Sequence, residues 1–141
     1  MELTELKSTI PFMLSGNYKN RFVAEYYQMK IRLEKLRQIV EKWDNGELKF
    51  TPTCPREIYD RQIPLMEGLL KVLEERAAIE GVDLTKEQST KDFIEAVQNG
   101  CTLLSDKAYS MPPCRSLSLI GTKLVEASLW AEYELKRREQ K

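Results

Sequence analysis

The sequence predicts an all-α fold, built as two antiparallel helical hairpins that assemble into an oligomeric helical bundle. Apolar residues recur at intervals of three and four through most of the chain, and no segment shows the sustained alternation typical of a β-strand. Prolines and Asn-Gly or Gly-Val pairs divide this pattern into four long segments. The composition, with 42% apolar and 31% charged residues, fits a folded chain and excludes a largely disordered one.

Three parts are expected along the chain. An N-terminal arm covers residues 1–16, a first helical hairpin covers 17–84, and a second helical hairpin covers 85–141. In the arm we expect a short amphipathic turn that Pro11 ends. Only the segment ELKFT, which follows the first long helix, has the composition of a short strand.

The first hairpin opens with the clearest pattern in the chain. A helix is predicted over 18–44, with Asn45-Gly46 as its left-handed end, because an unbroken seam has 4-3 spacing: Phe22, Tyr26, Met29, Leu33, Leu36, Val40 and Trp43. A second helix is predicted from about 55 to a Schellman end at Gly81-Val82, kinked or delayed by Pro64. Its expected apolar face holds Leu65, Leu69, Val72, Leu73, Ala77 and Ile79.

The second hairpin is expected to begin at a capping box, Thr85-x-x-Gln88. Its first helix has an apolar face of Phe93, Ile94, Val97, Cys101 and Leu104, and Asn99-Gly100 suggests a break or bend inside it. The segment from Tyr109 to Cys114 is expected to be a loop because it contains two consecutive prolines. The last helix is predicted over 115–138, with a face of Leu117, Ile120, Leu124, Ala127 and Ala131.

Composition narrows the possible functions. The chain has no histidine and three widely spaced cysteines, and it lacks both a Cys-x-x-Cys pair and a phosphate-binding glycine loop. We therefore expect no enzyme, no metal and no cofactor. A net charge of zero predicts no general binding of long nucleic acid or of a membrane surface. The acidic N-terminus does not resemble a signal peptide, so a cytoplasmic location is expected.

The start of the last helix carries the most suggestive group of polar residues. Unpaired N–H groups at a helix N-terminus attract anions, and the guanidinium of Arg115 matches phosphate. Residues Arg115, Ser118, Thr122 and Glu126 are spaced 3-4-4 and share one stripe of the helix. They could hold a phosphate-and-ribose ligand, with Gly121 permitting its close approach. Alternatively, the hydroxyls face solvent and Arg115 pairs with a carboxylate.

The first helix holds a second set of candidates: Tyr26, Tyr27 and Lys30. An aromatic ring can stack on a base while a lysine contacts a phosphate. Tyr26 belongs to the apolar seam, which favours core packing for its ring. Tyr27 and Lys30 fit either interpretation.

The stretch from Pro113 to Trp130, PCRSLSLIGTKLVEASLW, resembles the closing helix of a phage helical-hairpin family with the pattern P-S-R-E-x-S-L-A-L-T-K-L-E-E-A-x-M-W. This domain occurs in the phage anti-CBASS and anti-Thoeris sponges, which sequester cyclic-nucleotide or cyclic ADP-ribose signals. The resemblance covers residues 85–141. Separately, residues 14–84 are similar to a short phage helical family without an established activity.

The resemblance implies a phage protein that forms homo-oligomers, often hexamers, and binds a nucleotide second messenger without cleaving it. It adds Lys123 to the candidate ligand-binding residues, since this residue matches the pattern along with Arg115, Ser118, Thr122, Glu126 and Trp130. Cys114, Ser116, Gly121 and Val125 depart from the pattern. The departure at Cys114 removes a good N-cap, and Gly121 costs about 1 kcal/mol relative to Ala within a helix.

Two functions therefore compete. The chain is either an oligomeric sponge for a nucleotide signal or a helical interaction protein that binds and blocks a host protein. A homo-oligomer with even symmetry is expected in either case, because the apolar faces of the predicted helices exceed what one hairpin can bury.

Overall fold

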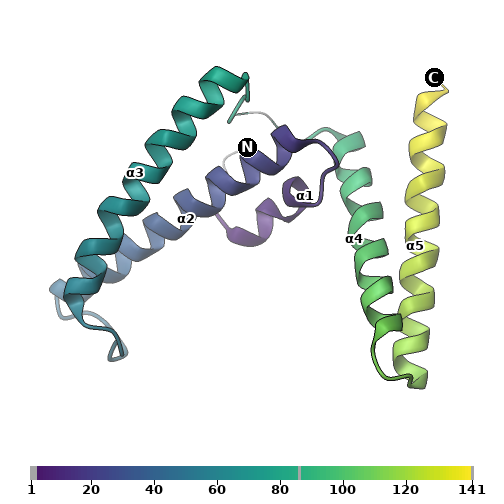
Figure 1. The fold of residues 1–141 in the computed structure, drawn as a ribbon. Coiled ribbons are helices and arrows are strands. Elements are labelled where there is room, and N and C mark those ends of the chain that lie inside the picture. The colour runs from purple at the N-terminus through teal and green to yellow at the C-terminus, as the bar shows by residue number, and fades with distance from the viewer. Residues whose placement is uncertain (1–2, 86, 141) are drawn as a thin grey trace. The chain divides into compact units, whose positions relative to one another are not determined.

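The computed structural model describes residues 3–85 and 87–140 of the 141-residue chain. Within these ranges every regular element is a helix and no strand is present (Figure 1), so the predicted all-α class is confirmed and ELKFT is not a strand. In chain order, the elements are the 3-10 helix η1 (Leu6–Thr9), α1 (Ile10–Met13), α2 (Tyr18–Asp44), α3 (Arg56–Glu80), α4 (Thr90–Ser110) and α5 (Arg115–Glu139).

The chain divides into two compact units, each built around one pair of long helices. The first unit holds residues 3–9 with 22–85, and the second holds residues 10–21 with 87–140. The expected N-terminal arm is thus shared between the units, since η1 joins the first unit and α1 joins the second.

The arm is helical through Pro11, where the sequence suggested an end. Pro11 is the second residue of α1, and the first four N–H groups of a helix have no intrahelical partner. Its missing N–H therefore costs no helical hydrogen bond. The preceding η1 ends at the buried Thr9, whose hydroxyl donates to the Leu6 carbonyl at 2.7 Å and accepts from the Gln28 amide at 2.9 Å.

Helices α2 and α3 form the predicted antiparallel hairpin. The bounds of both helices agree with the sequence prediction, and Gly46 and Gly81 adopt the left-handed conformation at their ends, with φ of 71° and 62°. Contacts along the hairpin run in opposite directions on the two helices: Phe22 with Arg76, Tyr26 with Glu74, Arg37 with Glu67, and Trp43 with Tyr59. The seam of α2 is buried at its start and half-buried toward its end.

The face of α3 that contacts α2 differs from the predicted one. The buried and half-buried side has 3-4 spacing: Arg56, Tyr59, Ile63, Met66, Leu70, Leu73, Ala77 and Glu80. Leu73 and Ala77 were predicted correctly, but Leu65, Leu69, Val72 and Ile79 are exposed on another side of the helix. The prediction was ambiguous because α3 carries two apolar stripes, and spacing alone does not show which stripe meets the partner helix.

Pro64 lies inside α3 and does not delay it. The helix is continuous from Arg56, although a proline at position 64 cannot donate the hydrogen bond that a helical N–H would make to the Asp60 carbonyl. The side chains that pack on α2 continue on both sides of this position, so tertiary packing offsets the missing bond.

Helices α4 and α5 form the second antiparallel hairpin. Three contacts fix their register: Lys91 with Glu139, Thr102 with Ser128, and Tyr109 with Thr122. Residues 10–21 pack on another side of α4, where Asn20 donates to Asp92 at 3.2 Å and Asn99 donates to the Leu14 carbonyl at 2.7 Å. The second unit is therefore a helical hairpin with the short α1 segment attached.

Small residues line the buried side of α4, in contrast to the predicted face. Ala96, Gly100, Ser105 and Ala108 are buried, whereas the predicted residues Phe93, Val97 and Leu104 are exposed. On α5 the side facing inward has 4-3 spacing: Leu117, Gly121, Leu124, Ser128, Ala131 and Leu135. The predicted members Ile120 and Ala127 are exposed. On α5 the predicted Leu117, Leu124 and Ala131 do lie inward. On α4 apolar size predicted the wrong residues, because small residues are buried where neighbouring segments approach closely.

The capping box of α4 lies four residues beyond the predicted one. Ser89 is the N-cap: its hydroxyl accepts from the Asp92 N–H at 3.1 Å, while the Asp92 carboxylate accepts from the Ser89 N–H at 3.2 Å. Thr85 instead bonds to Asp83, to which its hydroxyl donates at 2.7 Å. Both segments fit the capping pattern, since Asp replaces the usual Glu or Gln in the box that forms.

Helix α4 is unbroken at Asn99-Gly100, where a break or bend was expected. A Cβ atom at position 100 would come within 3.0 Å of the Leu14 side chain, so the glycine is explained by close packing. The helix also continues to Ser110, and only residues 111–114 separate it from α5.

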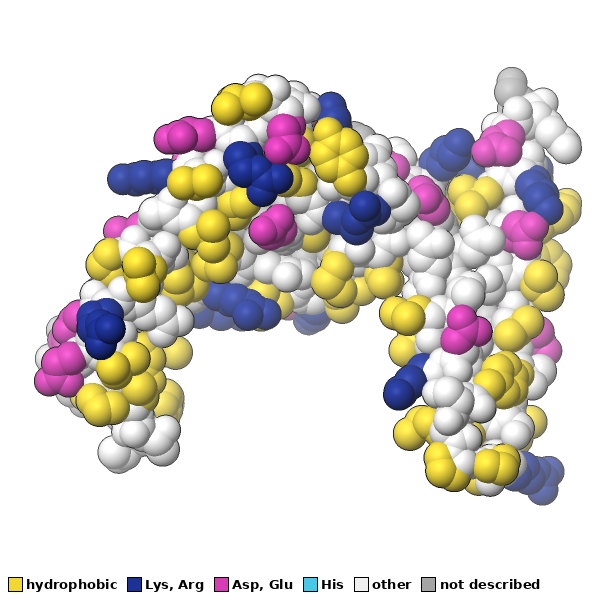
Figure 2. All heavy atoms as spheres, viewed as in Figure 1, with side chains coloured by type: hydrophobic (Ala, Val, Ile, Leu, Met, Phe, Trp, Pro, Cys, Tyr) yellow, Lys and Arg dark blue, Asp and Glu magenta, His cyan; other side chains and the backbone are white. Residues whose placement is uncertain are grey.

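Hydrophobic side chains remain at the surface of both hairpins among the charged residues, as Figure 2 shows. In the described ranges, no helix combines the length and apolar character that crossing a membrane requires.

Removing the Leu73 side chain tests the position of the first core. Leu73 is 1% exposed, so Leu73→Ala should lower the free energy of unfolding by about 2–5 kcal/mol. The control is Phe50→Ala, at a side chain that is 58% exposed, and it should change this free energy by less than about 0.5 kcal/mol. Urea denaturation followed by circular dichroism gives both values, and equal losses would contradict the core described.

Candidate ligand-binding sites

The predicted phosphate site lies where helix α5 begins. Cys114 is the N-cap residue, with extended backbone angles (φ −145°, ψ 159°), and its thiol accepts a hydrogen bond from the Leu117 N–H at 3.4 Å. Sulfur is a weak acceptor, so this cap satisfies the helix end less well than a serine would. The first intrahelical bond runs from the Ser118 N–H to the Cys114 carbonyl at 3.0 Å.

The four residues of the predicted stripe on α5 are all exposed: Arg115, Ser118, Thr122 and Glu126. The Thr122 hydroxyl donates to the Ser118 carbonyl at 2.9 Å and lies 3.4 Å from the Tyr109 hydroxyl. Because its proton is used inside the helix, Thr122 presents mainly acceptor lone pairs to its surroundings.

Two of the candidate residues on α5 pair with each other. The ammonium of Lys123 lies 2.9 Å from a Glu126 carboxylate oxygen, and both side chains are exposed. Within the described part of the chain, Arg115 makes no hydrogen bond or ion pair, so the structure does not hold it against a carboxylate. Arg115 is therefore the cation of this group with its donors open to a ligand.

Gly121 is covered by a side chain of its own hairpin. A Cβ atom at this position would come within 2.7 Å of the Tyr109 ring, and Gly121 is buried. The expectation that Gly121 permits a close approach of ligand is therefore wrong. The glycine accommodates the Tyr109 ring at the contact between α4 and α5, which also explains a residue that is unfavourable inside a helix.

The second set of candidates lies on α2, and the rings of Tyr26 and Tyr27 are packed against each other. Tyr26 is 7% exposed and Tyr27 is 9% exposed, and their ring centroids lie 5.3 Å apart at 84°. The Tyr26 hydroxyl donates to Glu74 at 2.8 Å. Burial, and then this bond to a carboxylate, raise the pKa of Tyr26 to about 12. Tyr26 thus belongs to the core, as its place in the seam predicted, and little of either ring is open for stacking on a base.

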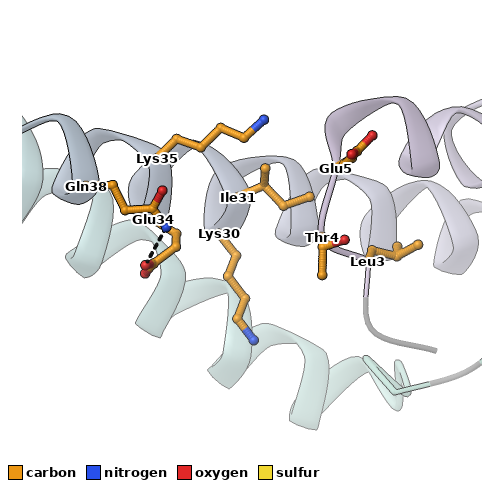
Figure 3. A pocket seen from close by; sticks show the side chains of 8 residues that line it. All are labelled: Leu3, Thr4, Glu5, Lys30, Ile31, Glu34, Lys35 and Gln38. Carbon is orange, nitrogen blue, oxygen red and sulfur yellow. Dashed lines mark hydrogen bonds between the residues drawn. The ribbon is translucent and has the colours of Figure 1, made fainter. Parts of the chain in front are cut away.

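Lys30 lies at the edge of a surface pocket (Figure 3). Its ammonium is 5.7 Å from the centroid of the Tyr27 ring, within the range of a cation–π contact. The pocket has a volume of about 460 Å³ and is lined by the residues labelled in Figure 3: Leu3, Thr4, Glu5, Lys30, Ile31, Glu34, Lys35 and Gln38.

The pocket is lined by equal numbers of acidic and basic side chains. Lys30 and Lys35 point to opposite sides of α2 in Figure 3, so their ammonium groups do not converge on one point. Glu34 accepts from Gln38 at 3.2 Å, and Glu5 pairs with Lys7 at 2.9 Å, a contact that lowers the pKa of the Glu5 carboxyl. The buried Leu3 and Ile31 provide an apolar surface between these groups. The pocket therefore suits a ligand with an apolar or aromatic centre and polar ends.

Among the residues that line this pocket, Lys30 was predicted from the sequence and the other lining residues were not. Four of the lining residues follow Lys30 on α2 at intervals of one and three: Ile31, Glu34, Lys35 and Gln38. That spacing defines a helix face beside the apolar seam, but its mixed charge resembles an ordinary solvated face. The contribution of Leu3 to Glu5 depends on how the arm folds back, which no local pattern predicts.

The structure offers no preformed metal centre in the residues it describes, since no three of the side chains Cys, Asp and Glu gather closely enough to hold an ion. The three cysteines are free thiols, half-buried at Cys54 and Cys101 and exposed at Cys114.

A comparison with protein families finds a match in the first hairpin. Residues 16–79 match the family model described as Sequestin. This is the family of phage anti-CBASS and anti-Thoeris sponges, so the resemblance predicted from the sequence is confirmed. No curated protein and no solved structure matches the chain.

The match lies in a different part of the chain from the one that suggested the family. It covers α2 and nearly all of α3, whereas the predicted sponge-type segment was residues 85–141. It includes Lys30 and four other lining residues of the pocket, and it does not reach α5.

The late titration of Tyr26 provides a test of the core around this pocket. A pKa of about 12, above the ordinary value of 10, means that the neutral phenol is favoured in the folded state. Its contribution to stability is complete below pH 10 and is lost as the pH rises from about 10 to 12. Phenolate absorbance should show one late-titrating tyrosine in the parent protein and none in Tyr26→Phe. A Tyr26→Phe variant that keeps the late step would contradict this assignment.

Proposed function

Because residues 16–79 match the Sequestin family of phage sponges, we propose that this chain is a phage anti-defence protein that binds an immune signal of the cyclic-nucleotide type and sequesters it without cleaving it. The signal is a cyclic oligonucleotide or cyclic ADP-ribose, and the protein acts in the cytoplasm of the infected cell. The family match is the observation that carries this proposal.

The start of α5 is the proposed ligand site. Arg115 and the first N–H groups of the helix hold a phosphate, because a guanidinium forms charge-assisted bonds and the helix N-terminus carries partial positive charge. Ser118 and Thr122 offer hydroxyl oxygens one and two turns further along the exposed face. Glu126 accepts from a ribose hydroxyl, and Lys123, now paired with Glu126, turns to a second phosphate.

The pocket beside Lys30 is the second position for the ligand. Its support is that α2 lies within the matched residues, while α5 lies outside them. The apolar surface of Leu3 and Ile31 accommodates a base, and Lys30 and Lys35 contact phosphates at opposite ends of the ligand.

Assembly into a homo-oligomer, of which a hexamer is the form implied by the resemblance, is part of the proposal. Its support is the number of large apolar side chains that a single chain leaves in water, on α3, α4 and α5 alike. A surface of this kind marks an interface in soluble proteins.

The competing function, a module that blocks a host protein, is favoured by one observation. Trp130 is 73% exposed on α5, and its ring lies 6.0 Å from the ring of Tyr133, which is also exposed. Tryptophan and tyrosine are enriched in the residues that dominate the energy of protein interfaces. In this case the exposed surface of α5 around Trp130 binds the host protein.

Depletion of a nucleotide mixture separates the two functions. Purified protein should remove one member from a mixture of cyclic di- and trinucleotides and cyclic ADP-ribose, and heating should release that compound intact. A chelator should have no effect, because the proposed binding uses no metal. Liquid chromatography with mass spectrometry measures both steps. Depletion of no member would favour the protein-blocking function, and turnover of a member would contradict simple sequestration.

A comparison of Arg115→Ala with Lys30→Ala decides between the two proposed ligand sites. A charge-assisted hydrogen bond contributes about 1.5–3 kcal/mol, so Arg115→Ala should weaken binding of the depleted nucleotide by roughly tenfold to a hundredfold if α5 holds it. Thr122→Ala should cost less, since one neutral bond contributes about 0.5–1.5 kcal/mol. The matched control is Arg138→Ala, an exposed arginine at the other end of the same helix. Calorimetry gives the affinities.

The ligand affinity of Lys30→Ala tests the second proposed site, the pocket on α2. If Arg115→Ala binds like the parent protein and Lys30→Ala loses affinity, the ligand lies in the pocket on α2. Thermal melts should be unchanged for both variants, because Arg115 and Lys30 are exposed.

A further inference from the structure

An apolar stripe runs along the exposed side of α3. We call it the outer stripe: Ile58, Leu65, Leu69, Val72 and Ile79, whose exposed fractions are 42%, 74%, 42%, 51% and 84%. The spacing is 7-4-3-7, so the five side chains share one side of a helix whose other apolar side packs on α2. The stripe spans about 32 Å, at 1.5 Å per residue. A regular seam of this length is typical of a helix that packs against a second helix.

Gly68 lies midway along the outer stripe, on one edge of it. It is exposed, and a Cβ atom there would meet nothing within 4 Å, so the fold of one chain does not require a glycine at this position. Glycine in the middle of a helix costs about 1 kcal/mol relative to alanine. A close approach of another chain would explain it, as the Leu14 side chain and the Tyr109 ring explain the two buried glycines of α4 and α5.

The outer stripe is complementary to itself when two copies of α3 run antiparallel. With a two-fold axis between Gly68 and Leu69, Ile58 of one copy lies opposite Ile79 of the other, and Leu65 lies opposite Val72. The two Gly68 residues then meet near the axis, and the two Leu69 residues meet beside them. Each large aliphatic side chain faces another one, and the smallest residues lie where the helices cross.

Charges beside the stripe fit the same arrangement. Arg61 and Glu75 lie seven residues before and after Gly68, on the same edge of the stripe, and both are exposed. Within the described residues, neither makes an ion pair. They lie 14 residues apart, or about 21 Å along the helix, too far to pair within one chain. In the antiparallel dimer, Arg61 of each copy lies beside Glu75 of the other, whereas a parallel dimer would leave them at different levels.

We propose that the outer stripe of α3 is the interface between two copies of this chain, packed antiparallel about a two-fold axis between Gly68 and Leu69. The partner is a second copy because one arrangement satisfies the apolar seam, the central glycine and both charges. The inference rests on the homo-oligomer of the proposed function and names its interface; the tests below use no ligand, so their failure is distinct from a failure of nucleotide binding. A two-fold interface of this kind is also compatible with larger even assemblies.

Exchanging the two charges tests the pairing. Arg61→Glu alone places like charges at both ends of the interface, and so does Glu75→Arg. Each should weaken the dimer by about tenfold, given two ion pairs of modest strength and their replacement by repulsion. The double variant Arg61→Glu/Glu75→Arg restores opposite charges and should restore the dimer. Sedimentation equilibrium over a range of micromolar concentrations gives the dissociation constants.

Rescue by the double variant cannot arise within one chain, because the two residues are too far apart to touch. A parent protein that remains a monomer at micromolar concentration, or a double variant as weak as either single one, would overturn the proposal. Circular dichroism confirms that each variant is folded.

A substitution within the outer stripe tests whether its apolar side chains hold the two copies together. Leu65→Glu should convert the dimer to a monomer, or a larger assembly to one without the α3 contact. The matched control is Leu103→Glu, at a leucine of α4 that is also exposed and lies outside the stripe; it should leave the α3 dimer intact. The opposite result, in which Leu103→Glu dissociates the copies and Leu65→Glu does not, would place the interface on the second hairpin and overturn the proposal.

Discussion

A two-helix hairpin can bury only one side of each helix, and the other features of this protein depend on that constraint. Long helices carry more apolar surface than one antiparallel partner covers. In α3, Leu73 and Ala77 are buried against α2, while Leu65 and Ile79 on other sides of the same helix are among the most exposed residues of the chain. The apolar surface left over is the part of the molecule available for assembly or for a partner.

The two hairpins meet this constraint with different side chains. The contact between α2 and α3 uses large residues, with Phe22, Tyr26 and Leu33 buried on α2 and aromatic and charged side chains crossing between the helices. The contact between α4 and α5 includes small residues of α5, such as Ala131 and the Gly121 that receives the Tyr109 ring. Small residues bury less apolar area, so the second hairpin leaves more large side chains in water.

The proposed sponge function would draw on both hairpins in different ways. The Sequestin match lies on α2 and α3, which carry the Lys30 pocket and the outer stripe. The open guanidinium and the exposed hydroxyls lie on α5. Antiparallel pairing of α3 would bring two copies of the matched hairpin together, and a ligand held at either proposed site would then be bound in symmetric pairs. Assembly and ligand binding can therefore be measured separately, because their residues lie on different surfaces.

The sequence by itself determined the helices. Heptad spacing, prolines at helix starts and glycines at helix ends located α2, α3 and α5 closely, because these signals act within a few residues of the backbone they control. The sequence also suggested the phage sponge family, but from residues 85–141; the match lies on α2 and α3, which were expected to belong to a family without an established activity. The capping box was misplaced because Thr85 and Ser89 both satisfy the local rule, and only one starts a helix that packs.

Only the tertiary structure decided which side of each helix is buried. On α3 the helical spacing and the hydrophobicity of the side chains fit the buried stripe and the exposed stripe equally well. On α4 they favoured Phe93 and Val97, whereas Ala96 and Gly100 are the residues that are buried. The pocket beside Lys30 likewise depends on residues 3–5, which reach α2 only when the chain folds back. The physical reason is that a side chain is buried only when another surface packs against it. The sequence of one helix alone therefore does not show which of its sides will be covered.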